Sequence, residues 1–229
     1  MKNKAIFLSF LLAPSISLSM SLEDELFQAT TDQRKEDVER LLNAGANPLF
    51  LHNGDSTPLM AIVYQQTPDA VEIQDMLMRY QLGEQVKMRN GHGRTLLHIA
   101  SRNFNPRLVQ LFIQAGADVN DCANNCHATP LIAASDIRWG RPEEDQYQIV
   151  RQLVEAGADL CIKDTQQRTA LEIAEWNGIK RIIPLLKGKL ASDNKDIQHA
   201  EEDSTKRKTK IMVDLRRSSR IQKKKIEKN

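Results

Sequence analysis

Apolar residues in the middle of the chain recur with the spacing of short helices. Between residues 107 and 115 they lie three and four positions apart, the spacing that gathers side chains on one helical face. The residues of this stripe are Leu108, Leu111, Phe112 and Ala115. An apolar run at 95–100 and a polar stretch at 101–106 precede the stripe, and Gly116 follows it. The pattern therefore predicts a short helix, a turn and a second helix that ends at the glycine.

The same unit recurs along the chain. A Thr-x-Leu sequence opens four units, at Thr57, Thr95, Thr129 and Thr169. A glycine closes the second helix of four units, at Gly45, Gly83, Gly116 and Gly157. The next threonine follows the glycine after 12 residues in three cases and after 13 in one. Because one such unit cannot bury its apolar face alone, this fixed phase predicts a stack of repeats that share a core.

Two motifs in the most regular unit resemble the ankyrin repeat. The segment 95–100, Thr-Leu-Leu-His-Ile-Ala, resembles the signature Thr-Pro-Leu-His-x-Ala at every fixed position but the proline. The segment 116–120, Gly-Ala-Asp-Val-Asn, resembles the run that joins one ankyrin repeat to the next. The resemblance implies an all-α solenoid of helix–turn–helix units joined by β-hairpin loops. It covers residues 22–190, with five repeats at about 22–47, 48–85, 86–119, 120–160 and 161–190.

The resemblance to ankyrin repeats implies binding to other proteins rather than catalysis. It carries no activity, small-molecule substrate or cofactor, and we expect a monomer with a protein partner of unknown identity. No nucleophile elbow, phosphate loop or HExxH motif is present in the sequence, which also argues against an enzyme. The implied contacts lie on hairpin tips and inner helices, at Asn53, Arg89, His92, Arg94, Asn125, Gln166 and Arg168, with Arg138, Trp139 and Arg141 at the edge.

Trp139 lies in an insertion that makes the fourth unit about seven residues longer than the third. Tryptophan and arginine are over-represented in binding hot spots, so Trp139 between two arginines predicts a contact with a partner. The alternative is that Trp139 folds back over its own lengthened turn and stacks on an arginine. The sequence leaves both interpretations open.

Cys122 and Cys126 lie in the one hairpin that is a residue longer than the others. They form either a disulfide across the hairpin tip, which would contribute about 2 kcal/mol at most, or two free thiols. Cys161 is then left over, and the spacing does not match a familiar zinc motif. His98 occupies the histidine position of the ankyrin signature, and we expect it to form structural hydrogen bonds.

Residues 1–19 have the organisation of a secretory signal peptide. Lys2 and Lys4 precede a nine-residue apolar core, and Ser17 and Ser19 supply small side chains before a cleavage site. Nine residues are too few to span a bilayer, which takes about 20. The sequence therefore predicts export to the periplasm or the medium, and a bacterial source. The alternative is an apolar helix that caps the first repeat.

Residues 191–229 lack the repeat pattern, and we expect a disordered basic tail. Residues 206–229 carry a net charge of +9, whereas the whole chain carries +2, so the remainder carries −7. The basic residues resemble nuclear-localisation clusters, and such clusters also bind nucleic acid or an anionic membrane surface. The alternative to a targeting or binding role is that the tail only keeps the protein in solution. The clusters are Lys206, Arg207, Lys208, Lys210, Arg216, Arg217, Arg220, Lys223, Lys224 and Lys225.

These features predict a non-enzymatic, exported interaction scaffold. One form of this hypothesis is an effector directed to host proteins, with the host nucleus as a destination. A second hypothesis is a periplasmic module that protects a partner protein. A third is a nucleic-acid-binding adaptor that uses the basic tail.

Overall fold

The computed structural model describes residues 20–136 and 143–191, which divide into two compact units between Leu96 and Leu97. Its named helices are α1 (Leu22–Thr31), α2 (Lys35–Asn43), α3 (Pro58–Ile62), α4 (Pro68–Met78), α5 (Leu82–Gln85), α6 (Leu96–Arg102), α7 (Pro106–Gln114), α8 (Pro130–Ser135), α9 (Glu143–Glu155) and α10 (Ala170–Trp176). A further helical stretch covers 183–191. The described residues contain no strand, only an isolated bridge between His52 and Ser56. The predicted all-α fold class is confirmed.

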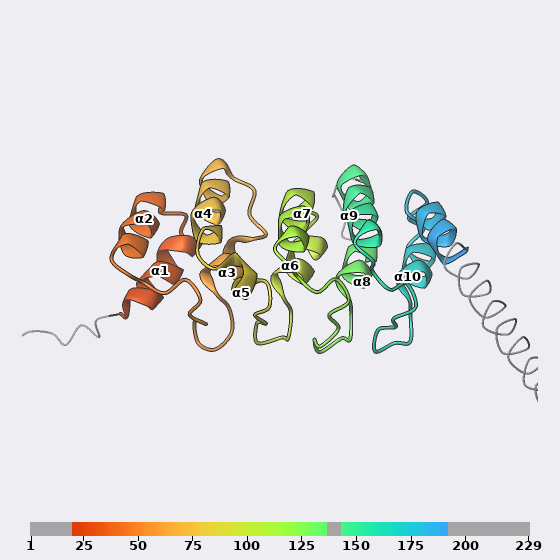
Figure 1. Ribbon diagram of the computed structural model, residues 1–229, viewed down its shortest axis with the longest axis horizontal. Coiled ribbons are helices and arrows are strands. Elements are labelled where there is room, and N and C mark those ends of the chain that lie inside the picture. Colours follow the sequence, from red (N-terminus) through yellow and green to blue (C-terminus); the bar gives the residue numbers. More distant parts are fainter. Residues whose placement is uncertain (1–19, 137–142, 192–229) are drawn as a thin grey trace, which may run out of the picture. The chain divides into compact units, whose positions relative to one another are not determined.

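The first unit arranges two helix pairs in two layers. Helix α1 packs against α2 and α3, and α4 packs against α2 and α3 (Figure 1). The side chains that fill the space between these layers are completely buried leucines and isoleucines: Leu26, Leu41, Leu59, Ile62, Ile73 and Leu77. Burial of one such side chain stabilises the fold by about 1.5–3 kcal/mol.

The second unit repeats this arrangement. Helix α8 packs against α9 and α10, and α9 packs against α7 (Figure 1). Its core side chains are Leu97, Leu108, Phe112, Leu131, Ile149 and Leu153. In the stripe predicted on α7, Leu108 and Phe112 are buried, whereas Leu111 and Ala115 are only half-buried. Val109 takes a core position instead.

The Thr-x-Leu openings at Thr57, Thr129 and Thr169 are helix caps. The side-chain oxygens of Thr57, Thr129 and Thr169 each accept a hydrogen bond from the main-chain N–H three residues later. Such a bond satisfies one of the unpaired donors at a helix start, and its loss costs about 1 kcal/mol. A proline at the first helical position fits because its missing N–H would have had no partner.

Three of the four predicted closing glycines end a helix in the expected way. Gly45, Gly116 and Gly157 have φ of 92°, 87° and 89°, which favours glycine. The prediction for Gly83 is wrong, because this residue lies inside the short helix α5. Gln81, with φ of 45°, makes the reversal there instead.

The sequence places Pro184 about one turn into the last helix and so predicts that it bends or shortens that helix. That helix covers 183–191, so the proline lies in its first turn. The first turn has no intrahelical partner for a main-chain N–H, and a proline is tolerated there.

Candidate protein-interaction surfaces

The inter-repeat loops are the segments 44–57, 86–95, 115–129 and 156–169, which join the second helix of one repeat to the first helix of the next. Figure 1 shows that in each unit they extend beyond the first helices of the repeats. Side chains at the tips of such loops are available to a partner only if the loop holds its shape. The shape of this surface therefore depends on the hydrogen bonds that close each loop.

Three of these loops are closed by an Asn or Asp five residues before the capping threonine, at Asn90, Asn124 and Asp164. In each case Oδ1 accepts hydrogen bonds from the main-chain N–H groups two and four residues later, at 2.8–3.1 Å. A short polar side chain that bonds its own main chain stabilises a turn without help from a strand partner. These loops therefore keep their shape although they contain no strand.

The first inter-repeat loop has His52 at the equivalent position and is held differently. The His52 ring stacks on Phe27 with centroids 4.2 Å apart, and its Nδ1 lies 2.9 Å from Asp24 Oδ1. Hydrogen bonds from Ser21 and His52 lower the pKa of Asp24. The loop is thus anchored to α1, and Asn53 at its tip pairs with His52 Nε2 at 2.9 Å.

Neighbouring loops are joined by hydrogen bonds within each unit. In the first unit the main-chain N–H of Gly91 donates to Asp55 O at 2.9 Å and to Asp55 Oδ1 at 3.1 Å. In the second unit Thr165 N donates to Cys126 O at 3.0 Å. The Asn120 side chain also bridges two loops, because its Oδ1 accepts from Asp159 N at 2.7 Å. In each unit, therefore, the two loops support each other.

The predicted partner-binding residues fall into two groups, one in each unit. Asn53, Arg89 and His92 are exposed on the first two loops, with Arg94 half-buried beside them. Asn125 and Gln166 are exposed on adjacent loops of the second unit, which the hydrogen bond between Thr165 and Cys126 brings together. Arg138, Trp139, Arg141 and the predicted basic tail lie outside the described residues, as do residues 1–19.

Arg168 has a structural partner that the sequence did not reveal. Its Nε and Nη2 donate to Asp164 Oδ2 at 3.1 and 2.8 Å. Burial raises the pKa of Asp164, but hydrogen bonds from the Arg168 side chain and main chain outweigh it and lower that pKa. Arg168 therefore stabilises its own loop, and it is a weaker candidate for a partner contact than Gln166.

Cys122, Cys126 and Cys161 are free thiols in the structure, so the predicted disulfide is not formed in it. Asn124 closes this loop instead, and His127 has a left-handed φ of 49°, as Gly93 and Gln167 have, at 73° and 61°, at the equivalent positions of the other loops. Across the described ranges, no group of three His, Cys, Asp or Glu side chains could hold a metal ion. No helix in these ranges is long and apolar enough to cross a membrane.

His98 has the structural role expected for it. It is 2% exposed, and its Nε2 lies 2.9 Å from the carbonyl oxygen of Ala128 and 3.1 Å from Asn124 Nδ2. The ring therefore joins α6 to the following inter-repeat loop. A buried side chain with these partners positions the loop and is not accessible to a partner protein.

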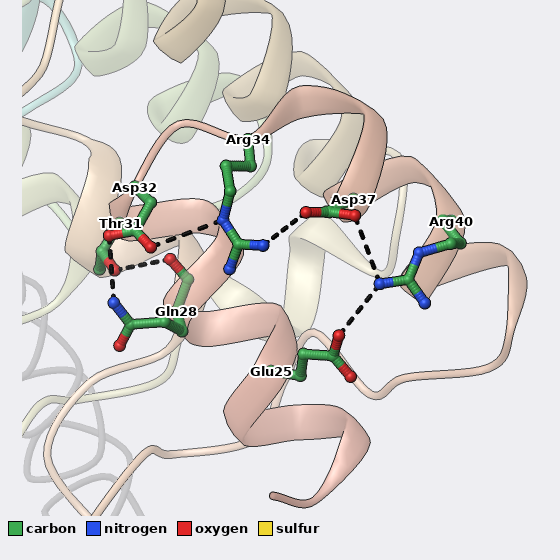
Figure 2. Close-up of polar contacts among 7 residues, drawn as sticks. All are labelled: Glu25, Gln28, Thr31, Asp32, Arg34, Asp37 and Arg40. Carbon is green, nitrogen blue, oxygen red and sulfur yellow. Dashed lines mark hydrogen bonds and ion pairs between the residues drawn. The ribbon is translucent and has the colours of Figure 1, made fainter. Parts of the chain in front are cut away.

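The first repeat carries a ladder of alternating charges on its surface. Figure 2 shows Arg40 between Glu25 and Asp37, at 3.0 and 3.3 Å, and Arg34 between Asp37 and Asp32. Hydrogen bonds with Glu25 and Asp37 raise the pKa of Arg40. Exposed ion pairs contribute at most about 1 kcal/mol each. The ladder ties α1 to α2, and its charges already have partners in the first repeat.

Trp176 is the exposed residue that sequence reasoning missed. It is 85% exposed at the end of α10, the highest value among the large apolar side chains of the described residues. It lies seven residues after Thr169, and the residues seven after the other threonines are Tyr64, Arg102 and Asp136. Tyr64 and Asp136 are exposed and Arg102 is half-buried, so the repeat register offers only a partial signal of an exposed tryptophan here.

Two buried glutamines lie in the second and fourth repeats, where the connections between helices, 63–67 and 136–142, are longer than 103–105 in the third. Gln74 Nε2 donates to Ile62 O at 2.9 Å, and Gln146 Nε2 donates to Ala134 O at 2.8 Å. In both repeats the carbonyl lies five residues after the opening threonine and the glutamine 17 after it. The longer connections between helices therefore do not leave the end of the first helix without hydrogen-bond partners.

Comparisons with known proteins agree with this architecture. The family model "Ankyrin repeats (3 copies)" matches residues 26–123, 74–164 and 97–198. A curated mouse protein, "B-cell lymphoma 3 protein homolog" from Mus musculus, is 25% identical over 179 residues. That match covers 66% of this chain and 39% of the mouse protein, so the chain spans well under half of this relative. Ankyrin repeats serve as protein-interaction modules that are generally not enzymes. Because the family model matches residues across 26–198, the chain belongs to the ankyrin-repeat family.

Proposed function

We propose that this chain is a non-enzymatic scaffold whose partner protein contacts the tips of the inter-repeat loops. The observation that carries the proposal is the contrast between closed loop bases and exposed tips. Asn124 and Asp164 are buried and close their loops, whereas Asn125 and Gln166 are exposed on them. A preformed loop loses little conformational entropy when a partner binds, which favours affinity.

The charge of the loop of residues 86–95 would favour some partner surfaces over others. It carries Lys87, Arg89 and Arg94, together with His92, and no acidic residue. Complementary charge mainly raises the rate of association and selects among partners. We therefore expect the partner surface that faces this loop to be acidic.

Affinity measurements with single variants would test the assignment to the loop tips. A partner captured with the mature chain would be purified, and its Kd measured by calorimetry against His92→Ala and Asn125→Ala. We expect at least one of these variants to weaken binding by about fivefold or more, the effect of a contact worth about 1 kcal/mol. Gln110→Ala, on the exposed face of α7, is the control. Loss of binding only in the control would refute the assignment.

We also propose that the chain is exported and that residues 1–19 are removed. The support is the basic, apolar and small-residue order of this segment. Determination of the amino terminus of protein recovered outside the cytoplasm should give Met20. Protein that keeps Met1 inside the producing cell would exclude export. Recovery with one stable partner in the periplasm would favour the protective module over a host-directed effector.

A second candidate function is nucleic-acid binding through residues 206–229. The observation in its favour is the net charge of +9 over these 24 residues. Binding by phosphate neutralisation weakens steeply with salt, because counterions are released. Nucleic-acid binding that survives deletion of 206–229, or that does not respond to salt, would exclude this function.

A further inference from the structure

Trp176 presents an unusual surface at the end of α10. An indole that is 85% exposed leaves a large apolar area in water, and such residues are concentrated in binding hot spots. Asn177, the next residue, donates from Nδ2 to Asp136 Oδ1 at 3.5 Å, which places the end of α8 beside the end of α10. Glu172 lies one turn before Trp176, on the same face of the helix.

The charges of the residues around Trp176 indicate which kind of segment could cover the indole. Residues 136–176 carry nine acidic and five basic side chains, a net charge of −4, and residues 177–191 add four basic side chains, of which Arg181 pairs with Glu144 and Lys187 with Glu175. Asp136 and Glu172 are both exposed: Asp136 lies beside Asn177, and Glu172, one turn before Trp176, uses its Oε2 to accept from Thr169 N and Oγ1. Lysine and arginine are attracted to the face of an aromatic ring, most strongly to tryptophan, and to carboxylates. The surface of Asp136, Glu172 and Trp176 is therefore suited to a segment rich in lysine or arginine.

The chain itself contains such a segment. Residues 206–229 carry a net charge of +9, and Ile211, Met212, Val213 and Leu215 lie between the basic clusters. These apolar side chains can cover an indole while the clusters on either side meet the carboxylates. The segment thus matches the surface in both charge and apolar character.

The position at which the described chain ends makes this segment the best-placed occupant. Lys187 Nζ lies 2.7 Å from Glu175 Oε1, so the last helix is held beside the residue next to Trp176. Residue 191 follows Lys187 by about one helical turn, a rise of about 6 Å. Residues 192–205 then form a connection whose root-mean-square length would be about 20 Å as a flexible chain. That length is ample for 206–229 to return to α10.

We propose that residues 206–229 dock on the surface of Asp136, Glu172 and Trp176 of the same molecule. Short flexible connections give effective concentrations of millimolar order, so even a millimolar Kd keeps roughly half of the molecules docked. A partner that binds at Trp176, or an anion that binds the basic segment, would then have to displace this contact. The inference goes beyond the proposed function and does not require any particular partner.

Quenching of tryptophan fluorescence by acrylamide tests the contact in the full chain. The sequence has two tryptophans, so Trp139→Phe leaves Trp176 as the single reporter. Acrylamide is uncharged and is not itself attracted to the basic segment. In this background, replacement of Arg216, Arg217 and Arg220 by glutamine should raise the quenching constant by about twofold, as expected if roughly half of the indoles were covered. Addition of 0.5 M salt to the unmodified segment should do the same, since salt screens exposed charges.

A second variant separates a specific contact from general attraction. Asp136→Asn keeps the acceptor for Asn177 but removes the charge, and it should raise quenching in the same direction. Equal quenching in all variants and at all salt concentrations would overturn the proposal. Protection that appears only as protein concentration rises would assign the contact to the segment of a second copy and would also overturn it. Circular dichroism would establish that each variant keeps its helices.

Discussion

Gln146 donates from its buried side-chain amide to the main-chain carbonyl of Ala134, 2.8 Å away. This bond satisfies the end of α8 where the insertion of the fourth repeat begins. Gln74 does the same for Ile62 at the same repeat positions. One buried side chain per insertion thus explains how the repeat tolerates a longer connection without loss of its core.

Replacement of Gln146 by methionine should destabilise the protein. Methionine fills a similar volume but leaves the Ala134 carbonyl without its donor, and an unsatisfied buried group costs about 1–3 kcal/mol. Urea unfolding should therefore show a lower midpoint. Gln148→Met on the same helix is the control, because Gln148 makes only an exposed contact with Glu144. Equal midpoints for the two variants would show that the buried bond does not contribute to stability.

Gly91→Ala should loosen the contact between the first two inter-repeat loops. A Cβ at this position would collide with the Asp55 carboxylate, which now accepts a hydrogen bond from Gly91 N. Loss of such a bond costs about 1 kcal/mol. The opposite result is expected for Gly188→Ala, where nothing lies within 4 Å. Gly188 is helical, and alanine there should stabilise by about 0.5–1 kcal/mol. Thermal unfolding of the two variants should shift the midpoint in opposite directions.

The sequence predicts the repeat architecture because that architecture depends on local chemistry. The threonine caps and three of the closing glycines act within a few residues of their own position, so their spacing is readable. The prediction fails at Gly83, where the buried Gln85 side chain caps the end of α4. Gln85 donates to Leu77 O and Tyr80 O, and Gln81 takes the positive φ. No local sequence pattern indicates that Gln81, rather than Gly83, makes the reversal.

The candidate surface is less predictable than the fold for a related reason. Arg168 and Gln166 look alike in the sequence, as polar residues at a loop tip, and only the structure shows Arg168 bound to Asp164. The exposure of Trp176 is not predicted from the sequence, although its position in the repeat can be read there. A tryptophan in an apolar helix is normally assigned to the core. Exposure depends on which neighbours cover a position, and spacing alone does not supply that.

Asn124→Ala and Asn125→Ala should separate loop closure from partner binding. Asn124 is 5% exposed and accepts from Cys126 N and Ala128 N, so its loss should destabilise by about 1–3 kcal/mol. Asn125 is exposed, and its replacement should leave the free energy of unfolding in urea within about 0.5 kcal/mol of the parent protein. A large loss of stability in Asn125→Ala would contradict the division between base and tip.

Asp164 should make stability depend on pH in acid. Its pKa is lowered from the ordinary 3.8, so the folded state binds this proton less readily than the unfolded state. The stabilisation is complete above pH 3.8 and is lost as the pH falls through the lowered pKa. Asp164→Asn keeps an Oδ1 acceptor, as Asn124 does in the equivalent loop, but removes the ion pair with Arg168. The urea midpoints of parent and variant should differ at pH 7 and converge only as the pH falls below the lowered pKa of Asp164. A constant difference down to the lowest pH that allows folding would contradict this assignment.

Arg181 should hold the last repeat against α9. Its guanidinium lies over the Tyr147 ring, 5.0 Å from the centroid, and it also pairs with Glu144. Arg181→Lys keeps the charge but loses the planar group that fits both partners, and Arg181→Met loses the charge as well. We expect lysine to cost a few tenths of a kcal/mol and methionine about 0.5–1 kcal/mol, in keeping with an exposed cation–π contact. If the ring matters, a double-mutant cycle with Tyr147→Leu should remove most of the stability difference between the parent protein and Arg181→Met. Independent, additive losses would show that Arg181 stabilises the repeat through Glu144 alone.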